Sequence, residues 1–298
     1  MSRVDEVLAA LRPRLGAPTG SPVVLGGGLT NENLRVSFAA HDVVVRLAGK
    51  RTDLLGIDRE DEAEAARNAS ALGIGPEVVA ELPELHSLVT RFVPADPLGE
   101  EEVRGERLAD IVGALLLLHD GPSVSAEFSV GEVVESYVLT AREHGVPEHE
   151  HEALARTVVE RTRALLTGPE HEPVTCHNDL LAANLLDDGD RLWIVDWEYA
   201  GMNDRFFDLA NLAVNNDLAP ADEQRLLALY FGGADDRRLA RLRLMRLVSD
   251  TREAYWGLVQ QAVSTFDFDY AAYADVHFQR LAVAGAGGRL EQLLNAAR

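Results

Sequence analysis

The sequence predicts an α+β protein of two lobes, a small β-rich lobe over residues 1–93 and a larger α-helical lobe over residues 94–298. Two observations lead to this prediction. Between about residue 20 and residue 93, short runs rich in valine and leucine alternate with glycine, proline and aspartate, which is typical of strands joined by turns. Beyond residue 93, apolar residues recur at helical spacing over long stretches. A chain of 298 residues supplies ample material for a buried core.

The first lobe should contain five strands and two helices. In order, we expect a helix at 4–15, a strand, glycine turn and strand within 21–38, a strand at 41–49, a helix at 56–76 and a β-hairpin at 77–93. The second helix has its acidic residues in the first turns, where the helix dipole favours them. Gly73 or Gly75 can close this helix, and Pro76 cannot continue it.

The second lobe should be mostly helical. Its helices are expected at 101–121, 130–145, 150–168, 208–217, 221–233, 235–266 and 270–287. They are interrupted by residues 175–201, which are predicted to form a loop, a strand, a turn and a second strand. The chain has no internal repeat and no low-complexity linker.

The composition excludes several classes of function. The formal net charge is −21 and the isoelectric point is about 4.8, so the surface repels nucleic acid and anionic membranes. Such a surface would attract a small cationic molecule, although a solvated acidic surface explains the charge more simply. The sequence leaves the oligomeric state open.

Cysteine usage and hydropathy favour a cytoplasmic protein. Cys176 is the single cysteine, so no intrachain disulfide can form and a reducing compartment fits. The N-terminus lacks the apolar core of a signal peptide. The longest apolar stretch, residues 111–118, is far too short to span a bilayer, so we expect no membrane insertion.

The chemistry is concentrated between residues 175 and 201. Asp179 lies in a loop five residues before Asn184, and a strand then delivers Asp196 twelve residues further on. Mg²⁺ prefers hard oxygen ligands, which Asn184 and Asp196 supply. Asp179 is left to accept a proton from a substrate hydroxyl, which is the division of labour that phosphoryl transfer requires. His177 is expected to hydrogen-bond the loop rather than to transfer a proton.

These motifs resemble those of the choline/ethanolamine kinase branch of the protein-kinase-like phosphotransferases, a superfamily that also includes aminoglycoside phosphotransferases. HNDL…N, VDWEYAGMNDRFFDLAN and WGLVQQAVSTFDFDYAAYA look like the catalytic loop, the metal strand and the C-terminal helix signature of that branch. The resemblance runs from about Gly26 to about Tyr273. It implies a bilobal protein-kinase-like fold that uses ATP and Mg²⁺ to phosphorylate the hydroxyl of a small molecule.

The resemblance places the ATP phosphates under the segment GGGLTNENL. Gly27 and Gly28 would let backbone N–H groups approach phosphate closely, and Thr30 and Asn31 would add side-chain donors. Read without the resemblance, this segment is a hairpin turn. The connection to the second lobe is expected to meet adenine through the backbone of Arg91, Phe92 and Val93.

The third strand should supply the cation for the phosphates. It offers Arg46 rather than lysine, and arginine presents a fixed fork of donors that stays charged. The branch pattern selects Glu62 as the carboxylate that orients Arg46, whereas Glu60 and Glu64 are expected to be solvated.

The acceptor is expected to be a small cationic alcohol such as choline or ethanolamine. Aromatic faces and carboxylates suit an organic cation, although most such rings serve as core. The expected acceptor residues are Glu198, Tyr199, Asp204, Trp256 and Tyr270. Glu198 and Trp256 lie on the branch motifs, whereas Asp204 could instead cap the following helix and hold Arg205.

Two departures from choline kinases leave the acceptor open. The chain has Gly201-Met202 where those enzymes usually carry a further aromatic residue, and it lacks their second tryptophan near WGL. A kinase for aminoglycosides, thiamine or a sugar is the alternative within the superfamily. A catalytically inactive nucleotide-binding regulator is a weaker alternative, because Asp179, Asn184 and Asp196 are all present.

Overall fold

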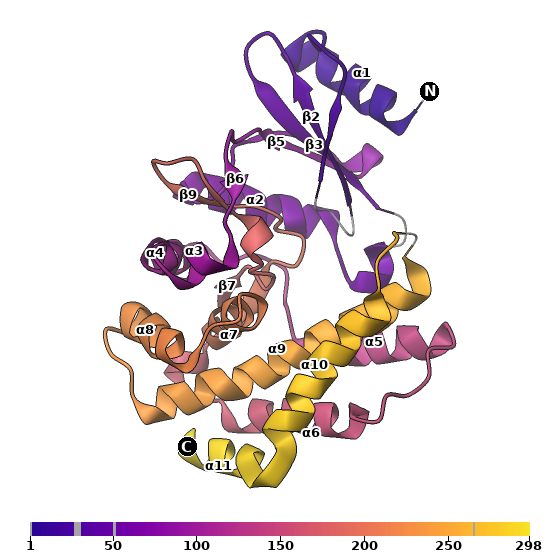
Figure 1. The fold of residues 1–298 in the computed structure, drawn as a ribbon. Helices are drawn as coiled ribbons and strands as arrows, with labels where there is room; N and C mark the ends of the chain where they lie inside the picture. The colour runs from indigo at the N-terminus through magenta and orange to yellow at the C-terminus, as the bar shows by residue number, and fades with distance from the viewer. Residues whose placement is uncertain (1, 27–30, 50–51, 265) are drawn as a thin grey trace. The chain divides into compact units, whose positions relative to one another are not determined.

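The computed structural model describes residues 2–26, 31–49, 52–264 and 266–298 (Figure 1). The chain forms two compact units. Unit 1 contains residues 1–98 and 183–199, and unit 2 contains residues 99–182 and 200–298. An antiparallel sheet near the N-terminus is followed by a mainly helical region, so the predicted α+β fold is confirmed.

Unit 1 is built on a five-stranded antiparallel sheet with the strand order β1-β2-β3-β5-β4. Its elements are α1 (Arg3–Leu15), β1 (Val23–Leu25), β2 (Asn31–Ser37), β3 (Asp42–Ala48), η1 (Thr52–Leu55), α2 (Arg59–Leu72), β4 (Val78–Leu82), η2 (Pro83–Leu85), β5 (Ser87–Arg91), β6 (Asp96–Pro97), η4 (Ala182–Asn184, which begins on the last residue of a unit 2 segment), β8 (Leu185–Asp187) and β9 (Leu192–Ile194). The expected helix inserted after the third strand is α2.

The core of unit 1 lies between α1 and one face of the sheet. Val7 and Leu11 of α1 are fully buried against Val43 and Val45 of β3 and Val89 of β5. Because successive side chains of a strand point to opposite faces, this burial leaves the alternate residues of β3 on the other face of the sheet. That face carries Arg46.

The ends of α2 follow from its sequence. Asp58 caps the N-terminus by accepting the N–H groups of Glu60 and Asp61. Gly73 closes the helix in the left-handed conformation (φ 75°), which glycine adopts without steric cost. Of the two glycines that could end this helix, the chain uses the first.

The segment 183–199 belongs to unit 1 because its backbone pairs there. β8 lies between β6 and β9 in a three-stranded sheet. The N–H of Leu98 donates to the carbonyl of Leu185 (2.8 Å), and the N–H of Ile194 donates to that of Ile74 (2.7 Å). The first segment of unit 1 thus ends at residue 98, whereas the expected boundary was after residue 93, and residues 183–199 return to the same unit. The sequence does not reveal this return, because pairing between distant segments leaves no local trace in it.

Unit 2 is organised by one long helix. Its elements are α3 (Glu100–Arg104), α4 (Leu108–His119), α5 (Val130–Glu143), α6 (Glu152–Leu165), η3 (Pro169–His171), β7 (Val174–Cys176), β10 (Gly201–Asn203), α7 (Arg205–Asn215), α8 (Pro220–Phe231), α9 (Asp236–Val263), α10 (Tyr270–Gly285), η5 (Ala286–Gly288) and α11 (Arg289–Ala296). α9 has 28 residues and contacts α5, α6, α7, α10 and α11. Figure 1 shows α9 in orange and α10 in yellow, side by side.

Two local expectations for unit 2 were wrong. The single helix expected over 101–121 is broken at Gly105, whose backbone (φ −95°, ψ −113°) leaves the helical region, and α4 starts afresh after Arg107. The short antiparallel pair of β7 with β10 was also not expected, because each strand has only three residues. No helix among the described residues is long and apolar enough to cross a membrane.

Candidate active site

The third strand presents Arg46 to a cavity of about 450 Å³ in unit 1. Val44 and Arg46 line this cavity from β3, while Val43, Val45 and Leu47 of the same strand are buried on the core side. Strand alternation therefore explains how a buried apolar strand offers one cation to a cavity.

Arg46 forms two ion pairs with carboxylates from distant parts of unit 1. Its Nη1 bonds the Glu62 carboxylate of α2, and its Nη2 lies 2.7 Å from Oδ1 of Asp196. Burial acts to lower the pKa of Arg46, but Asp196, Glu62 and Glu198 together raise it above its ordinary value. The expected pairing of Arg46 with Glu62 is present, and Glu60, at the start of the same helix, is exposed.

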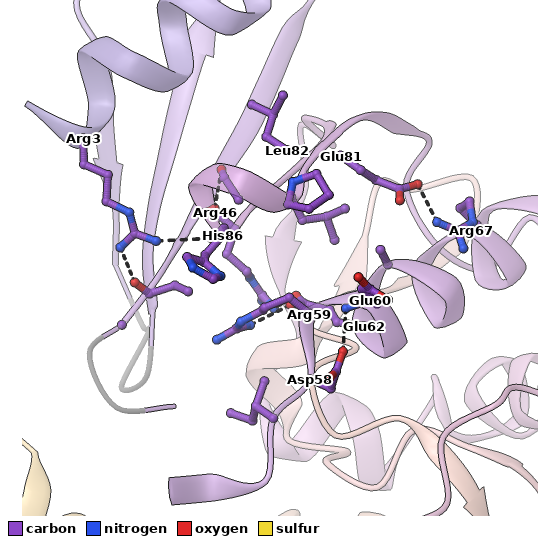
Figure 2. Close-up of a pocket in the computed structure, with 17 residues that line it drawn as sticks. Arg3, Arg46, Asp58, Arg59, Glu60, Glu62, Arg67, Glu81, Leu82 and His86 are labelled. Atoms are coloured by element: carbon purple, nitrogen blue, oxygen red, sulfur yellow. Dashed lines mark hydrogen bonds and ion pairs between the residues drawn. The ribbon is translucent and has the colours of Figure 1, made fainter. Parts of the chain in front are cut away.

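A second arginine, which the sequence analysis missed, extends this network. Nη1 of Arg59 lies 2.6 Å from Glu62 and 3.3 Å from Glu198, and its Nη2 donates to Oδ1 of Asn31 (3.0 Å). Nδ2 of Asn31 in turn donates to Glu198 (2.7 Å). Figure 2 shows Arg46, Arg59 and Glu62 together in the wall of a second cavity of about 830 Å³. The spacing of Arg59 three residues before Glu62, at the start of a helix, is the one sequence signal for it.

Glu198 therefore lies in a buried network of ion pairs and hydrogen bonds in unit 1. Its side chain is 3% exposed, and burial together with the nearby Asp196 raises its pKa. Tyr199 is also buried in unit 1. The structure thus places Glu198 with Arg46 and Arg59. The predicted contact of Glu198 and Tyr199 with the acceptor stays a prediction.

The two predicted metal ligands face the same cavity as Arg46. Asn184 and Asp196 both line the 450 Å³ cavity, Asn184 from the end of η4 and Asp196 two residues beyond β9. Asp196 adopts a left-handed backbone conformation (φ 69°), which is uncommon for a residue other than glycine. An amide and a carboxylate that line one cavity offer oxygen donors of the kind that Mg²⁺ prefers.

The predicted adenine contact lies on this cavity too. Arg91, Phe92 and Val93 are among its lining residues. The N–H groups of Arg91 and Phe92 already donate to the carbonyls of Glu77 (2.8 Å) and Asp42 (3.0 Å), so adenine would have to use other backbone groups of the segment. The predictions for Gly27, Gly28 and Thr30 lie outside the described residues.

In unit 2, the loop that carries Asp179 is held by a buried carboxylate. Oδ2 of Asp208 accepts the backbone N–H of His177 (2.9 Å), and Oδ1 accepts that of Asn178 (2.7 Å). Burial acts to raise the pKa of Asp208, but its hydrogen bond with His119 and its other donors lower the pKa below the ordinary value. Asn178 has a left-handed backbone (φ 66°), so the loop turns sharply just before Asp179.

Other side chains of α7 hold the loop after Asp179. Oδ1 of Asn211 accepts the N–H of Leu180 (2.5 Å), and Nδ2 of Asn216, at the C-terminal cap of α7, donates to the Leu180 carbonyl (2.9 Å). Side chains of α7 and its cap thus satisfy these backbone polar groups, as a buried loop requires. Sequence reasoning did not assign this role to Asp208, and it missed Asn211.

Asp179 contacts both its own loop and α9. Its backbone N–H donates to Nδ1 of His177 (3.2 Å), which agrees with a loop-stabilising role for His177. Its Oδ1 lies 3.3 Å from Nη1 of Arg252. Arg252 was also missed, although a charged Arg252-Glu253 pair one turn before Trp256 is unusual in a buried part of a helix.

The predicted aromatic residues meet at the junction of α9 and α10. The ring of Trp256 packs edge-on against the rings of Tyr270 and Tyr273, with ring centroids 5.8 Å and 5.6 Å apart. Asp204, by contrast, caps α7 through the N–H of Phe206 (2.8 Å) and lies 2.5 Å from Nδ1 of His171. The capping role that the sequence left open for Asp204 is therefore present.

His119, Cys176 and Asp208 bring three potential metal-ligand atoms within 4.8 Å of one another in unit 2. Burial and the nearby carboxylates raise the pKa of the Cys176 thiol, and both oxygens of Asp208 already accept N–H groups. Nδ1 of His119 lies 2.6 Å from the Tyr230 hydroxyl. We interpret this cluster as hydrogen-bonded support for the loop.

The fold defines a small-molecule kinase. Residues 23–218 match the family model described as choline/ethanolamine kinase. The chain belongs to the choline/ethanolamine kinase family.

Individual relatives agree with this family. The chain is 28% identical to ethanolamine kinase 2 of Mus musculus over 288 residues, covering 85% of this chain and 73% of that protein. A choline/ethanolamine kinase family protein from Mesorhizobium loti has a similar crystal structure, with a TM-score of 0.83 and 32% identity. The match covers 100% of this chain and 99% of that chain. Choline kinase LicA of Streptococcus pneumoniae shares the fold at 22% identity, with a TM-score of 0.78 and coverage of 98% and 100%. A crystal structure of LicA in complex with AMP also has this fold, with 22% identity and a TM-score of 0.75.

Proposed function

We propose that this protein transfers the γ-phosphoryl group of Mg-ATP to the hydroxyl of a small amino alcohol such as choline or ethanolamine. The observation that carries the proposal is the cavity of about 450 Å³ in unit 1. One wall holds the predicted adenine segment, and the same cavity is lined by Arg46, Asn184 and Asp196. A nucleotide needs these three features together: a place for its base, a cation for its phosphates and oxygen ligands for its metal.

Asn184 and Asp196 would hold Mg²⁺, which would neutralise charge on the phosphate oxygens as the reaction proceeds. Arg46 would bind phosphate oxygens through its planar fork of donors, and Glu62 would keep that fork oriented. The present ion pair of Arg46 with Asp196 shows that the Asp196 carboxylate faces a cationic group.

Asp179 would act as the general base. The acceptor hydroxyl donates its proton to the Asp179 carboxylate as its oxygen forms a bond to the γ-phosphorus, and the bond from that phosphorus to the β–γ bridging oxygen of ADP breaks. Hydrogen bonds that N–H groups of the loop donate to α7 side chains would keep Asp179 in one place during this step. Trp256 and Tyr270 would offer aromatic faces to the acceptor's cationic end.

The deciding experiment measures ATP consumption by the purified protein with Mg²⁺ and one acceptor at a time. Choline, ethanolamine, thiamine and kanamycin form the panel, and a reaction without acceptor gives the background. We expect choline or ethanolamine to stimulate turnover most. Stimulation by thiamine or kanamycin alone would reject the amino-alcohol assignment and favour another small-molecule kinase.

A further inference from the structure

The cation that faces the proposed general base comes from α9. Nη1 of Arg252 lies 3.3 Å from Oδ1 of Asp179 and 2.8 Å from Oε1 of Glu253, so one guanidinium nitrogen joins two carboxylates of unit 2. The Arg252 side chain is 1% exposed and that of Asp179 is 13% exposed. At such burial, charge pairs are screened little by water, and their geometry matters more than at a surface.

Glu253 is itself held on three sides. Its Oε1 accepts from Arg252 and from Nδ2 of Asn211 (3.3 Å), and its Oε2 accepts from the Tyr273 hydroxyl of α10 (2.7 Å). Burial acts to raise the pKa of Glu253, but Arg252 and the other donors lower it, so the carboxylate is held ionised. Burial and the adjacent Glu253 raise the pKa of Tyr273, so its hydroxyl stays a donor.

Asn211 connects this network to the catalytic loop a second time. Its Oδ1 accepts the N–H of Leu180, the residue that follows Asp179, while its Nδ2 donates to Glu253 and to Ser249. The loop backbone and the Asp179 carboxylate are thus anchored to the same pair of α9 residues. A shift of Glu253 would move both anchors.

We propose that Arg252 is a positioning residue for the general base: Glu253, held by Tyr273 and Asn211, fixes the guanidinium, and the guanidinium fixes the Asp179 carboxylate for proton transfer from the acceptor. This inference rests on the proposed function, because it assigns Asp179 the role of base. The network places two carboxylates around one guanidinium, which leaves net negative charge for a cationic acceptor.

A purely structural role for Arg252 must be separated from this one. If Arg252 only neutralises the buried Glu253, then removing both charges should restore both stability and kcat. Replacing both partners of a buried ion pair is often nearly neutral for stability. The test therefore compares Arg252→Met with the double variant Arg252→Met/Glu253→Gln. Glutamine keeps oxygen and nitrogen atoms near Asn211 and Tyr273.

The measurements are the melting temperature, kcat, and the KM values for Mg-ATP and for choline or ethanolamine. We expect Arg252→Met to lower the melting temperature, and the double variant to recover most of it. We expect kcat of the double variant to stay roughly 10- to 100-fold below wild type, with KM for Mg-ATP changed by less than about twofold. Arg252→Lys, which keeps the charge, should recover part of the lost kcat.

Tyr273→Phe tests the same chain of contacts with a smaller change. Loss of the hydroxyl that holds Glu253 should lower kcat about threefold. Tyr255→Phe is the matched control, because Tyr255 lies on α9, is buried and packs its ring against Phe278. It should leave kcat unchanged.

The outcomes separate the two proposals. A folded double variant with wild-type kcat would overturn the positioning role and leave the kinase assignment intact. If the double variant does not fold, a wild-type kcat in Tyr273→Phe would overturn the positioning role instead. If the wild-type protein shows no acceptor-dependent turnover, the proposed function fails and this inference fails with it.

Discussion

The two units hold their functional side chains by different means. In unit 1, Arg46 is placed by ion pairs with Glu62 and Asp196 on the wall of a cavity. In unit 2, the loop around Asp179 is placed by backbone N–H groups that donate to the buried side chains of Asp208 and Asn211.

The difference bears on what ligands can change. A phosphate oxygen can compete for Arg46 and a metal ion can compete for Asp196, so ion pairs on a cavity wall can be exchanged for ligand contacts. Hydrogen bonds between a buried carboxylate and loop amides have no such competitor. We therefore expect nucleotide to rearrange the Arg46 network and to leave the Asp208 contacts unchanged.

The largest effect should come from removing the base. Asp179→Asn should lower kcat by roughly 10²- to 10⁴-fold, because the amide cannot accept the acceptor's proton. Since the base acts on the acceptor, the Kd for Mg-ATP should change by less than about twofold. Steady-state kinetics and nucleotide titration check this, and near-normal turnover would remove Asp179 from the mechanism.

The second prediction breaks the support of the loop. In Asp208→Asn the side chain loses its charge and turns one acceptor into a donor that faces a backbone N–H. We expect a loss of about 3 kcal/mol in the free energy of unfolding. We also expect kcat to fall roughly 30-fold.

Asp222→Asn is the control for this change, because Asp222 also accepts a backbone N–H, that of Ala219, but at an exposed position. Denaturant unfolding and kinetics on both variants make the comparison. Equal effects in the two variants would show that burial of Asp208 is not what matters.

The third prediction concerns the exchangeable network of unit 1. Arg46→Met should raise KM for Mg-ATP about 20-fold, because a charge-assisted contact to phosphate is lost. Arg67→Met is the control, since Arg67 forms a half-exposed pair with Glu81 in the same unit. The control should leave KM unchanged, and a similar rise in both variants would argue against a specific phosphate contact.

The fourth prediction tests the acceptor side of unit 2. Trp256→Ala should raise KM for choline about 10-fold and KM for ethanolamine less, because a quaternary ammonium relies on aromatic faces whereas a primary ammonium can use hydrogen-bond acceptors. Trp193→Ala, on β9 of unit 1, is the control. A larger effect on ethanolamine than on choline would contradict an aromatic contact at Trp256.

The smallest effect should distinguish two glutamates of one helix. Glu62→Gln weakens the orientation of Arg46 and should raise KM for Mg-ATP about fivefold. Glu60→Gln, at an exposed position two residues earlier, should change nothing measurable. If Glu60→Gln has the larger effect, the assignment of Glu62 to Arg46 is wrong.

Much of the fold could be predicted because its signals are local. The valine-rich run of β3, the Gly73 cap of α2 and the helical spacing of apolar residues in unit 2 each act within a few residues. The spacing of Asp179, Asn184 and Asp196 likewise carries the chemistry in one short segment. The break at Gly105 escaped prediction because a single glycine within a helical pattern is usually tolerated.

The partners of these residues were decided only by the tertiary structure. Arg59 reaches Glu198 across 139 positions of sequence, and Arg252 reaches Asp179 across 73. The sequence by itself determined which side chains can bind metal, accept a proton or carry charge, because these are properties of the residues. It could not determine which carboxylate each arginine meets, since strand pairing and helix packing bring distant segments together, and in a buried environment that encounter sets both charge state and orientation.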